Sequence, residues 1–332
     1  MSTLPFPRPR SVRRPLAILG LLAALLAGCA LTLAVGKLGI PLARQPRALL
    51  ELLDGGGGFA LRRLRGPRLM TGLGTGAALG LAGALFQRAT ANPLVTPDVI
   101  GITAAAGAGT ALATFWHLPV LPGSLGGALL AGALVGWVTT TGFRNPGAVI
   151  VAGIGVAAGA TALTQLVLVW SRQAEAMALA SALTGSLNSR SWQDAALVWA
   201  VLLPGCLAAL ALRTDLELVA LGDEAAHGLG SRPGMTRALS LGLGIALTAA
   251  AVAVAGPVTF VALTAPHLAR WLTGRPAMGT AALVGALEVC LADLAVAHWP
   301  VLDGLPVGVV TALLGGIFLG VLLISQFRKG AL

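Results

Sequence analysis

Residues 69–87 read LMTGLGTGAALGLAGALFQ, an apolar run without a charged residue. About 20 such residues cross the hydrocarbon core of a bilayer as an α-helix. Within the run, Gly72, Gly76 and Gly80 recur at every fourth position, and Gly83 follows. Small residues at this spacing let helix backbones approach closely in lipid, where packing holds helices together. The run therefore predicts a transmembrane helix that packs tightly against its neighbours.

The rest of the chain has the same character. Of its 332 residues, 56% are apolar and 10% are charged, and its mean hydropathy is +0.87. A soluble domain carries about 25% charged residues, so an ordinary soluble enzyme is disfavoured. Ten apolar stretches follow one another at 16–35, 69–87, 94–114, 121–141, 148–170, 194–212, 238–257, 258–272, 280–297 and 307–325. We predict an all-α, polytopic membrane protein in which residues 1–332 form a single transmembrane domain of about ten helices.

Prolines interrupt this regular pattern. Pro257, Pro266 and Pro306 lie inside or beside predicted spans. Each is expected to break a helix, because proline has no backbone N–H to donate and its ring clashes with the preceding turn. Broken backbone is tolerated at membrane depth only where protein covers it or where it lines a cavity. We therefore expect short, irregular helices around residues 256–272.

Basic residues orient the chain. The formal net charge is +10, but the basic residues form no run between aromatic residues of the kind that binds nucleic acid. Lys and Arg in short loops instead mark the cytoplasmic side of a membrane protein. Basic residues precede the first span and follow the last, which places both termini in the cytoplasm. Residues 1–15 are then an N-terminal cytoplasmic tail, and residues 213–237 are a cytoplasmic loop.

The first external segment departs from this bias. Seven basic residues lie on the wrong side of the membrane: Lys37, Arg44, Arg47, Arg62, Arg63, Arg65 and Arg68. One interpretation is an exception that is tolerated because neighbouring helices fix the topology. The other is a docking surface for an acidic external partner.

Groups that could carry chemistry are few. Asp98, His267, Glu288 and Asp293 are the ionisable residues at or near membrane depth. They form no nucleophile–base pair or metal-spaced cluster, and the chain has no GxxxxGK[ST] phosphate loop. We therefore expect neither catalysis nor nucleotide hydrolysis by this chain. One alternative remains open, a secondary transporter that couples to an ion through Glu288, Asp293 or Asp98.

The start of the chain also resembles a processing signal. Leu26-Ala27-Gly28-Cys29 follows a basic, apolar stretch, as in a lipoprotein cleavage site. Small residues beside a cysteine are common in helices rich in Ala and Leu. We interpret the segment as part of an uncleaved first helix, and lipidation of Cys29 stays open.

Motifs in a fixed order then point to a family. They are Arg65-Gly66-Pro67-Arg68, Gly80-x-x-Gly83-x-x-x-Gln87, Asn92-Pro93-Leu94-x-x-Pro97-Asp98-x-x-Gly101, Leu221-Gly222-Asp223-Glu224-Ala225-Ala226-x-x-Leu229-Gly230, Ala255-Gly256-Pro257-x-x-Phe260, Ala265-Pro266-His267 and Leu305-Pro306-Val307-Gly308. With further matches they span approximately residues 65–325. The sequence thereby resembles the iron-chelate (FecCD-type) permeases of bacterial ABC importers.

This resemblance implies a permease in the bacterial inner membrane, with inverted repeats formed by helices 2–5 and 7–10. It implies an importer assembled with a second permease subunit, either homologous or identical, and with two cytoplasmic ATPases. A periplasmic or lipoprotein siderophore-binding protein would deliver the chelate. Because the chelator itself holds the iron, the resemblance implies no metal site and no cofactor in this chain.

The resemblance also assigns roles to residues. Arg65 and Arg68 match arginines that meet glutamates of the binding protein, which suits the planar fork of arginine. ATPase coupling is assigned to Leu221, Gly222, Asp223, Glu224, Ala226, Leu229 and Gly230. Structural or pathway roles are assigned to Gln87, Asn92, Pro93, Gly155, Gly159, Pro257, Pro266, His267, Pro306 and Gly308.

A few positions depart from the family pattern. Ala297 stands where an arginine is common, Gly304 where a glutamate often precedes Leu-Pro-Val-Gly, and Gly315-Gly316-Ile317 where Gly-Ala-Pro is usual. The run from Leu305 to Ile317 is similar to one subtype, the ferric enterobactin permease subunit that pairs with a different, homologous permease. Ferric enterobactin or another catecholate is therefore the expected chelate.

Overall fold

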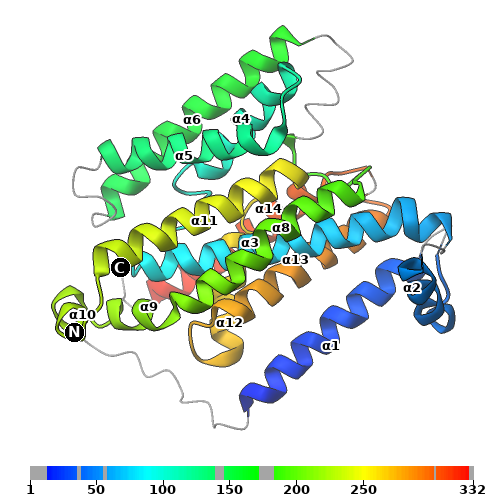
Figure 1. Ribbon diagram of the computed structural model, residues 1–332, viewed down its shortest axis with the longest axis horizontal. Helices are drawn as coiled ribbons and strands as arrows, with labels where there is room; N and C mark the ends of the chain where they lie inside the picture. The colour runs from blue at the N-terminus through cyan, green and yellow to red at the C-terminus, as the bar shows by residue number, and fades with distance from the viewer. Residues whose placement is uncertain are drawn as a thin grey trace.

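The computed structural model describes residues 13–35, 39–54, 58–138, 146–171, 183–302 and 304–328. These residues form helices joined by turns, and no β-strand occurs among them (Figure 1). The prediction of an all-α protein is confirmed.

In this part of the chain, one helix corresponds to each of the ten predicted spans. Seven are long and apolar enough to cross a membrane: α1 (Arg13–Ala34), α3 (Gly66–Ala89), α5 (Val120–Val138), α6 (Pro146–Trp170), α8 (Trp192–Ala211), α11 (Pro233–Ala255) and α13 (Met278–His298). The remaining three are α4 (Ile102–Phe115), α12 (Val261–Thr273) and α14 (Val307–Arg328).

Short elements lie outside these helices. They are η1 (Leu42–Arg44), α2 (Gln45–Leu53), the π-helical η2 (Ala60–Arg65) that leads into α3, α9 (Arg213–Val219) and α10 (Asp223–Gly228). Figure 1 shows α9 and α10 at one end of the molecule and α2 at the opposite end. This separation agrees with loops on opposite sides of a membrane. The predicted tail at residues 1–15 falls largely outside the described residues, so the orientation of the termini stays a prediction.

Helix α3 is the centre of the molecule. It packs against α8, α11, α12 and α13, and most of its residues are buried. A Cβ atom on Gly76 or Gly80 would overlap the backbone of α13, and one on Gly83 would overlap the Ala262 carbonyl of α12. The prediction that residues 69–87 form a tightly packed helix is therefore confirmed, because these contacts leave no room for side chains.

The packing repeats between two halves of the chain. Helix α3 begins the first half and packs against α12 and α13, while α11 begins the second half and packs against α4 and α5. In both halves a break in the chain follows the first helix. The short helix after each break is preceded by a residue in the left-handed region, Gly101 at φ +79° and Phe260 at φ +67°. This correspondence agrees with the predicted repeats of helices 2–5 and 7–10.

Two of the three prolines lie at helix boundaries. Pro257 lies in the break between α11 and α12, and Pro306 directly precedes α14. The expectation of irregular structure around residues 256–272 is confirmed, since residues 256–260 are not helical and α12 is only 13 residues long.

The prediction that Pro266 breaks a helix is wrong, because it lies inside α12. Proline at this position cannot donate to the Ala262 carbonyl four residues earlier. That carbonyl instead faces Gly83 on α3, where no side chain intervenes. The close crossing of α3 and α12 therefore tolerates the missing hydrogen bond.

Candidate functional site

The loop at residues 213–237 folds into α9 and α10 before α11 begins. Sharp turns bound α10 on both sides, at Gly222 with φ +105° and at Gly230 with φ +85°. Residues that carry a side chain rarely adopt this backbone conformation, whereas glycine adopts it readily. A Cβ atom at either glycine would meet no atom within 4 Å. The requirement for glycine at these two positions is therefore conformational and not steric.

The side chains of α10 and its flanks divide into charged, buried and exposed groups. Asp223 and Glu224 occupy its first turn, where negative charge is stabilised by the positive end of the helix dipole. Ala226 is completely buried, and it fixes one face of α10 against the protein. Leu221 and Leu229, at the two ends of α10, are 65% and 62% exposed. Two large apolar side chains thus project from the loop.

Arg237 on α11 connects α10 to α3. Its Nη1 and Nη2 atoms donate to the two carboxylate oxygens of Asp223 at 3.0 and 2.7 Å. Its Nε donates to the backbone carbonyl of Ala89, the last residue of α3, at 3.1 Å. Arg237 is the last residue of the predicted cytoplasmic loop at residues 213–237, and no sequence motif singles it out.

The same end of α3 is fixed by Gln87 and Asn92. The Gln87 side chain is buried, and its Oε1 accepts a long hydrogen bond of 3.4 Å from Arg270 on α12. The Asn92 side chain accepts from the backbone N–H of Leu94 at 2.9 Å and closes the turn that contains Pro93. These predicted residues therefore lie together where α3 ends and the chain turns toward α4.

Arg65 has an internal partner at the opposite end of α3. Its Nη1 donates to three backbone carbonyls at the end of α1, those of Thr32 at 2.7 Å, Leu33 at 3.1 Å and Val35 at 2.7 Å. Carbonyls at the end of a helix lack intrahelical donors, so Arg65 caps α1 and holds it against η2 and α3.

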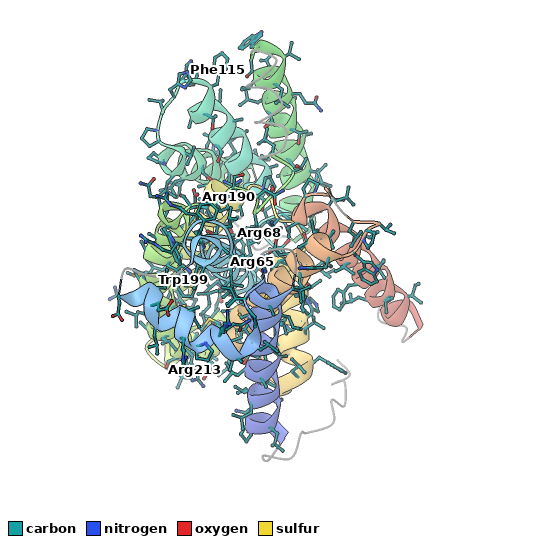
Figure 2. The ribbon with its side chains drawn as sticks, turned by 90° about the vertical axis from the view of Figure 1, so that its right-hand side faces the viewer. Arg65, Arg68, Phe115, Arg190, Trp199 and Arg213 are labelled. Atoms are coloured by element: carbon teal, nitrogen blue, oxygen red, sulfur yellow. The ribbon has the colours of Figure 1, made fainter. Side chains whose placement is uncertain are left out.

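Arg68 forms a two-pronged ion pair with Asp293 on α13, in which Nε and Nη2 donate to the carboxylate at 2.8–3.0 Å. Figure 2 labels Arg65 and Arg68 side by side at the start of α3. No local sequence pattern indicates either contact, because Arg65 bonds to carbonyls 30–33 residues away and Asp293 lies 225 residues from Arg68. Four other arginines of the external segment are exposed: Arg44, Arg47, Arg62 and Arg63.

Asp98 lies between the two halves of the chain. One carboxylate oxygen accepts from the Thr103 hydroxyl on α4 at 2.6 Å, and the other accepts from the backbone N–H of Phe260 at 3.0 Å. Asp98 therefore meets the start of α4 and the start of α12 together. Glu288 on α13 has a different partner, the Thr264 hydroxyl at 2.8 Å. Each of these two acids therefore accepts hydrogen bonds from its own neighbours within the chain.

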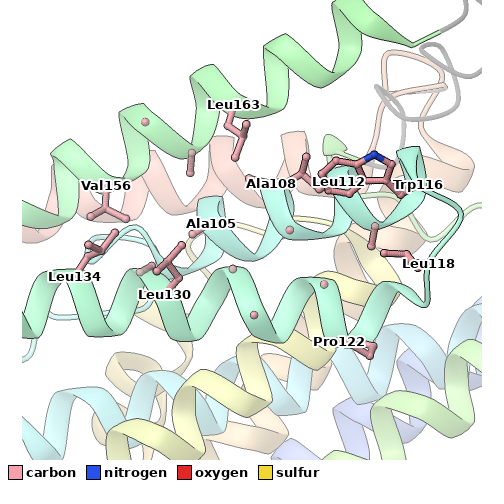
Figure 3. A pocket seen from close by; sticks show the side chains of 18 of the residues that line it. Ala105, Ala108, Leu112, Trp116, Leu118, Pro122, Leu130, Leu134, Val156 and Leu163 are labelled. Carbon is pink, nitrogen blue, oxygen red and sulfur yellow. The ribbon is translucent and has the colours of Figure 1, made fainter.

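Gly155 and Gly159 lie on α6 beside a cavity of about 940 Å³ between α4, α5 and α6. Figure 3 shows alanine, leucine and valine side chains pointing into this cavity, with Trp116 at one end. A Cβ atom on either glycine would meet no atom within 4 Å. The two glycines thus face open, apolar space and not a neighbouring helix.

The start of α14 packs against the break between α11 and α12. The Gly308 N–H donates to the Gly185 carbonyl at 2.8 Å, and a Cβ on Gly308 would crowd the Pro257 carbonyl. His267 on α12 lies near Phe318 of α14, with ring centroids 6.0 Å apart in an edge-to-face arrangement. Gly308, Pro257 and His267 therefore connect α12 and α14.

Comparison with known proteins places the chain in a family. Residues 24–325 match the FecCD transport family. The chain belongs to this family. It is 38% identical to the ferric enterobactin transport system permease protein FepG of Escherichia coli, over 79% of this chain and 82% of FepG. It is 35% identical to the Fe(3+) dicitrate transport system permease protein FecD of the same organism, over 87% and 92% of the two chains.

A solved structure agrees with this assignment. A metal-chelate type ABC transporter in an inward-facing conformation matches with a TM-score of 0.79 and 26% identity, over 93% of this chain and 99% of that chain. The protein is thus a permease subunit of an iron-chelate ABC importer, a multi-pass protein of the inner membrane and not an enzyme. Among the described residues, no group of three or more His, Cys, Asp or Glu side chains is placed to hold a metal ion.

Proposed function

We propose that this permease imports a ferric siderophore, specifically ferric enterobactin or another catecholate. The observation that carries this choice is the 38% identity to FepG, against 35% and 33% to the citrate permeases FecD of Escherichia coli and YfmD of Bacillus subtilis. The iron remains inside its chelator during import, so the permease needs neither a metal ligand nor a cofactor of its own.

The pathway in this proposal lies between two permease subunits, a homologous partner or a second copy of this chain. Figure 2 shows α6 and α14 diverging from the body of the molecule. Both helices carry exposed apolar side chains, among them Ile154 on α6 and Ile317 on α14. Gly155 and Gly159 add open space beside α6. Small and apolar groups suit the passage of a large chelate, since they offer no strong binding site to trap it.

Coupling to two cytoplasmic ATPases is proposed for α10 and its flanks. Leu221 and Leu229 provide exposed apolar contacts, while Gly222 and Gly230 set the angle at which α10 leaves the protein. Apolar side chains that a helix exposes can fill an apolar groove in a partner protein. Import would then consume ATP that the partner subunits hydrolyse.

Docking of a periplasmic or lipoprotein siderophore-binding protein is proposed for the basic segment that contains Arg65 and Arg68. Their internal hydrogen bonds fix the start of α3, and the exposed Arg62 and Arg63 project from the same turn of chain. Arginines on a rigid support can hold carboxylates of an acidic partner bidentately. Arg62→Glu combined with Arg63→Glu should weaken docking of the binding protein without unfolding the permease, as measured by co-purification and by thermal stability.

Uptake measurements test the proposal. Cells that depend on this importer should take up ⁵⁵Fe as a ferric catecholate, and less of it as citrate or hydroxamate complexes. A labelled corrinoid, which carries cobalt and no iron, should also be taken up less. Uptake should survive a protonophore and stop when the ATPase gene is deleted. Preferred uptake of another chelate would overturn the catecholate choice, and the reverse response to protonophore and deletion would favour ion coupling through Asp98, Glu288 or Asp293.

A further inference from the structure

The last turn of α3 ends in four backbone carbonyls that have no intrahelical donor. Three of them bond to the chain that follows directly: Phe86 accepts from Thr90, Gln87 from Asn92 and Arg88 from Ala91. The fourth, on Ala89, accepts from Arg237 of α11, which is 148 residues away in the sequence. A distant arginine thus completes the end of the central helix.

The rest of the same guanidinium group holds α10. Both of its terminal nitrogens donate to Asp223, the first residue of α10, in a bidentate pair. The Arg237 and Asp223 side chains are 23% and 35% exposed, so the pair is partly shielded from water. The rigid fork of arginine allows one side chain to fix two partners at a set angle, which lysine cannot do.

A second ion pair nearby provides a contrast. Arg213 and Glu217 are four residues apart on α9 and bond at 3.1 Å, with side chains 64% and 54% exposed. A solvent-exposed pair within one helix contributes little. Glu217 also lies 4.0 Å from Arg88 of α3, so the hydrogen bond from Arg213 is the part of this contact that stays within one helix. The Arg237 bridge differs because it joins three elements, α10, α11 and the end of α3.

We propose that Arg237 is a positioning residue for energy coupling, which transmits displacement of α10 to the end of α3. This inference rests on the proposed contact between α10 and the ATPase. Helix α3 packs against four other transmembrane helices, so a displacement that reaches its end acts on the core of the permease. The Ala89 carbonyl is the point of transfer, because it receives the third nitrogen of the guanidinium.

The experiment uses the whole importer in proteoliposomes and measures ATP hydrolysis and chelate transport separately. Arg237→Lys and Asp223→Asn should assemble with the ATPase and hydrolyse ATP, but should transport about tenfold less chelate per ATP, within the range typical of coupling between sites. Arg213→Ala is the matched control, because it removes the exposed pair on α9 and leaves Glu217 beside Arg88 of α3. Its transport per ATP should remain that of the wild type.

A charge exchange separates a three-element bridge from a simple ion pair. Asp223→Arg with Arg237→Asp restores the attraction between α10 and α11, but aspartate at 237 cannot donate to the Ala89 carbonyl. We expect this double variant to remain uncoupled. Full recovery of transport per ATP would overturn the inference, and so would a proportional loss of hydrolysis and transport in both single variants. If the wild-type chain fails to bind the ATPase at all, the proposed function itself is refuted.

Discussion

Helices α3 and α6 carry glycines at the same four-residue spacing, yet these glycines have opposite surroundings. On α3, side chains at Gly76 and Gly80 would overlap the backbone of α13. On α6, side chains at Gly155 and Gly159 would meet no atom within 4 Å. The spacing lets two surfaces approach closely, but it does not specify whether the second surface is within the chain, in a partner or absent. The consequences of substitution should therefore differ between the two helices.

The largest effect is expected at the contact between α3 and α13. Gly80→Leu places a side chain where the Ala281 carbonyl lies, so backbone must move. We expect the free energy of unfolding to fall by more than about 3 kcal/mol, which exceeds the usual cost of overpacking. Thermal unfolding of the purified permease in detergent, together with its yield in membranes, measures this loss. Gly316→Leu on α14 meets no atom within 4 Å and is the control. Equal stability of the two variants would contradict the close contact.

A smaller loss of stability is expected when the ion pair that joins the same two helices, α3 and α13, is broken. Arg68→Ala leaves the carboxylate of Asp293, which is 5% exposed, without its charged donor. Because the Arg68 side chain is 26% exposed, water replaces part of the interaction. We therefore expect the free energy of unfolding to fall by about 2 kcal/mol. The same thermal assay applies. Adding Asp293→Ala should recover part of the stability, since the unpaired charge is then removed. A double variant less stable than Arg68→Ala would argue against the pair.

These two contacts show what sequence could and could not predict. The apolar stretches predicted the ten helices, because hydrophobicity and length are local properties. Pairing of Arg68 with Asp293, or of Arg237 with Asp223, depends on how helices cross, which no local pattern records. The prediction that Pro266 breaks a helix failed for the same reason. The Ala262 carbonyl, to which Pro266 cannot donate, lies against Gly83 of another helix, α3.

The family motifs identified the loop at residues 221–230, but they did not reveal how α10 is attached. Its glycines could be predicted as turn residues from their identity alone. The bridge through Arg237 could not, because the arginine also fits the general bias for basic residues in such loops. The external arginines show the converse, since Arg65 and Arg68 were predicted to bind a partner and also have structural contacts within the chain.

A third substitution separates conformation from packing within one short helix. Gly222→Val must adopt φ +105° with a branched side chain, although no atom lies within 4 Å. Backbone strain of this kind costs about 1–3 kcal/mol, and the loop should relieve it by turning α10. Transport should therefore fall more than thermal stability does. Gly228→Ala, which lies in α10 and also meets no atom, should leave transport unchanged. Equal transport by both variants would show that the turn at Gly222 is not required.

The smallest effect on stability is expected on α6, because Gly155 and Gly159 have open space beside them where Gly80 of α3 has the backbone of α13. Gly155→Leu and Gly159→Leu fill open space, and leucine favours a helix over glycine by up to about 1 kcal/mol. The thermal midpoint should stay constant or rise slightly. If α6 lines the proposed pathway, uptake of the chelate should nevertheless fall, because bulk replaces space beside the large cavity. Loss of stability comparable to that of Gly80→Leu would show that α6 packs against protein at these positions. Unchanged uptake would move the pathway away from this face of α6.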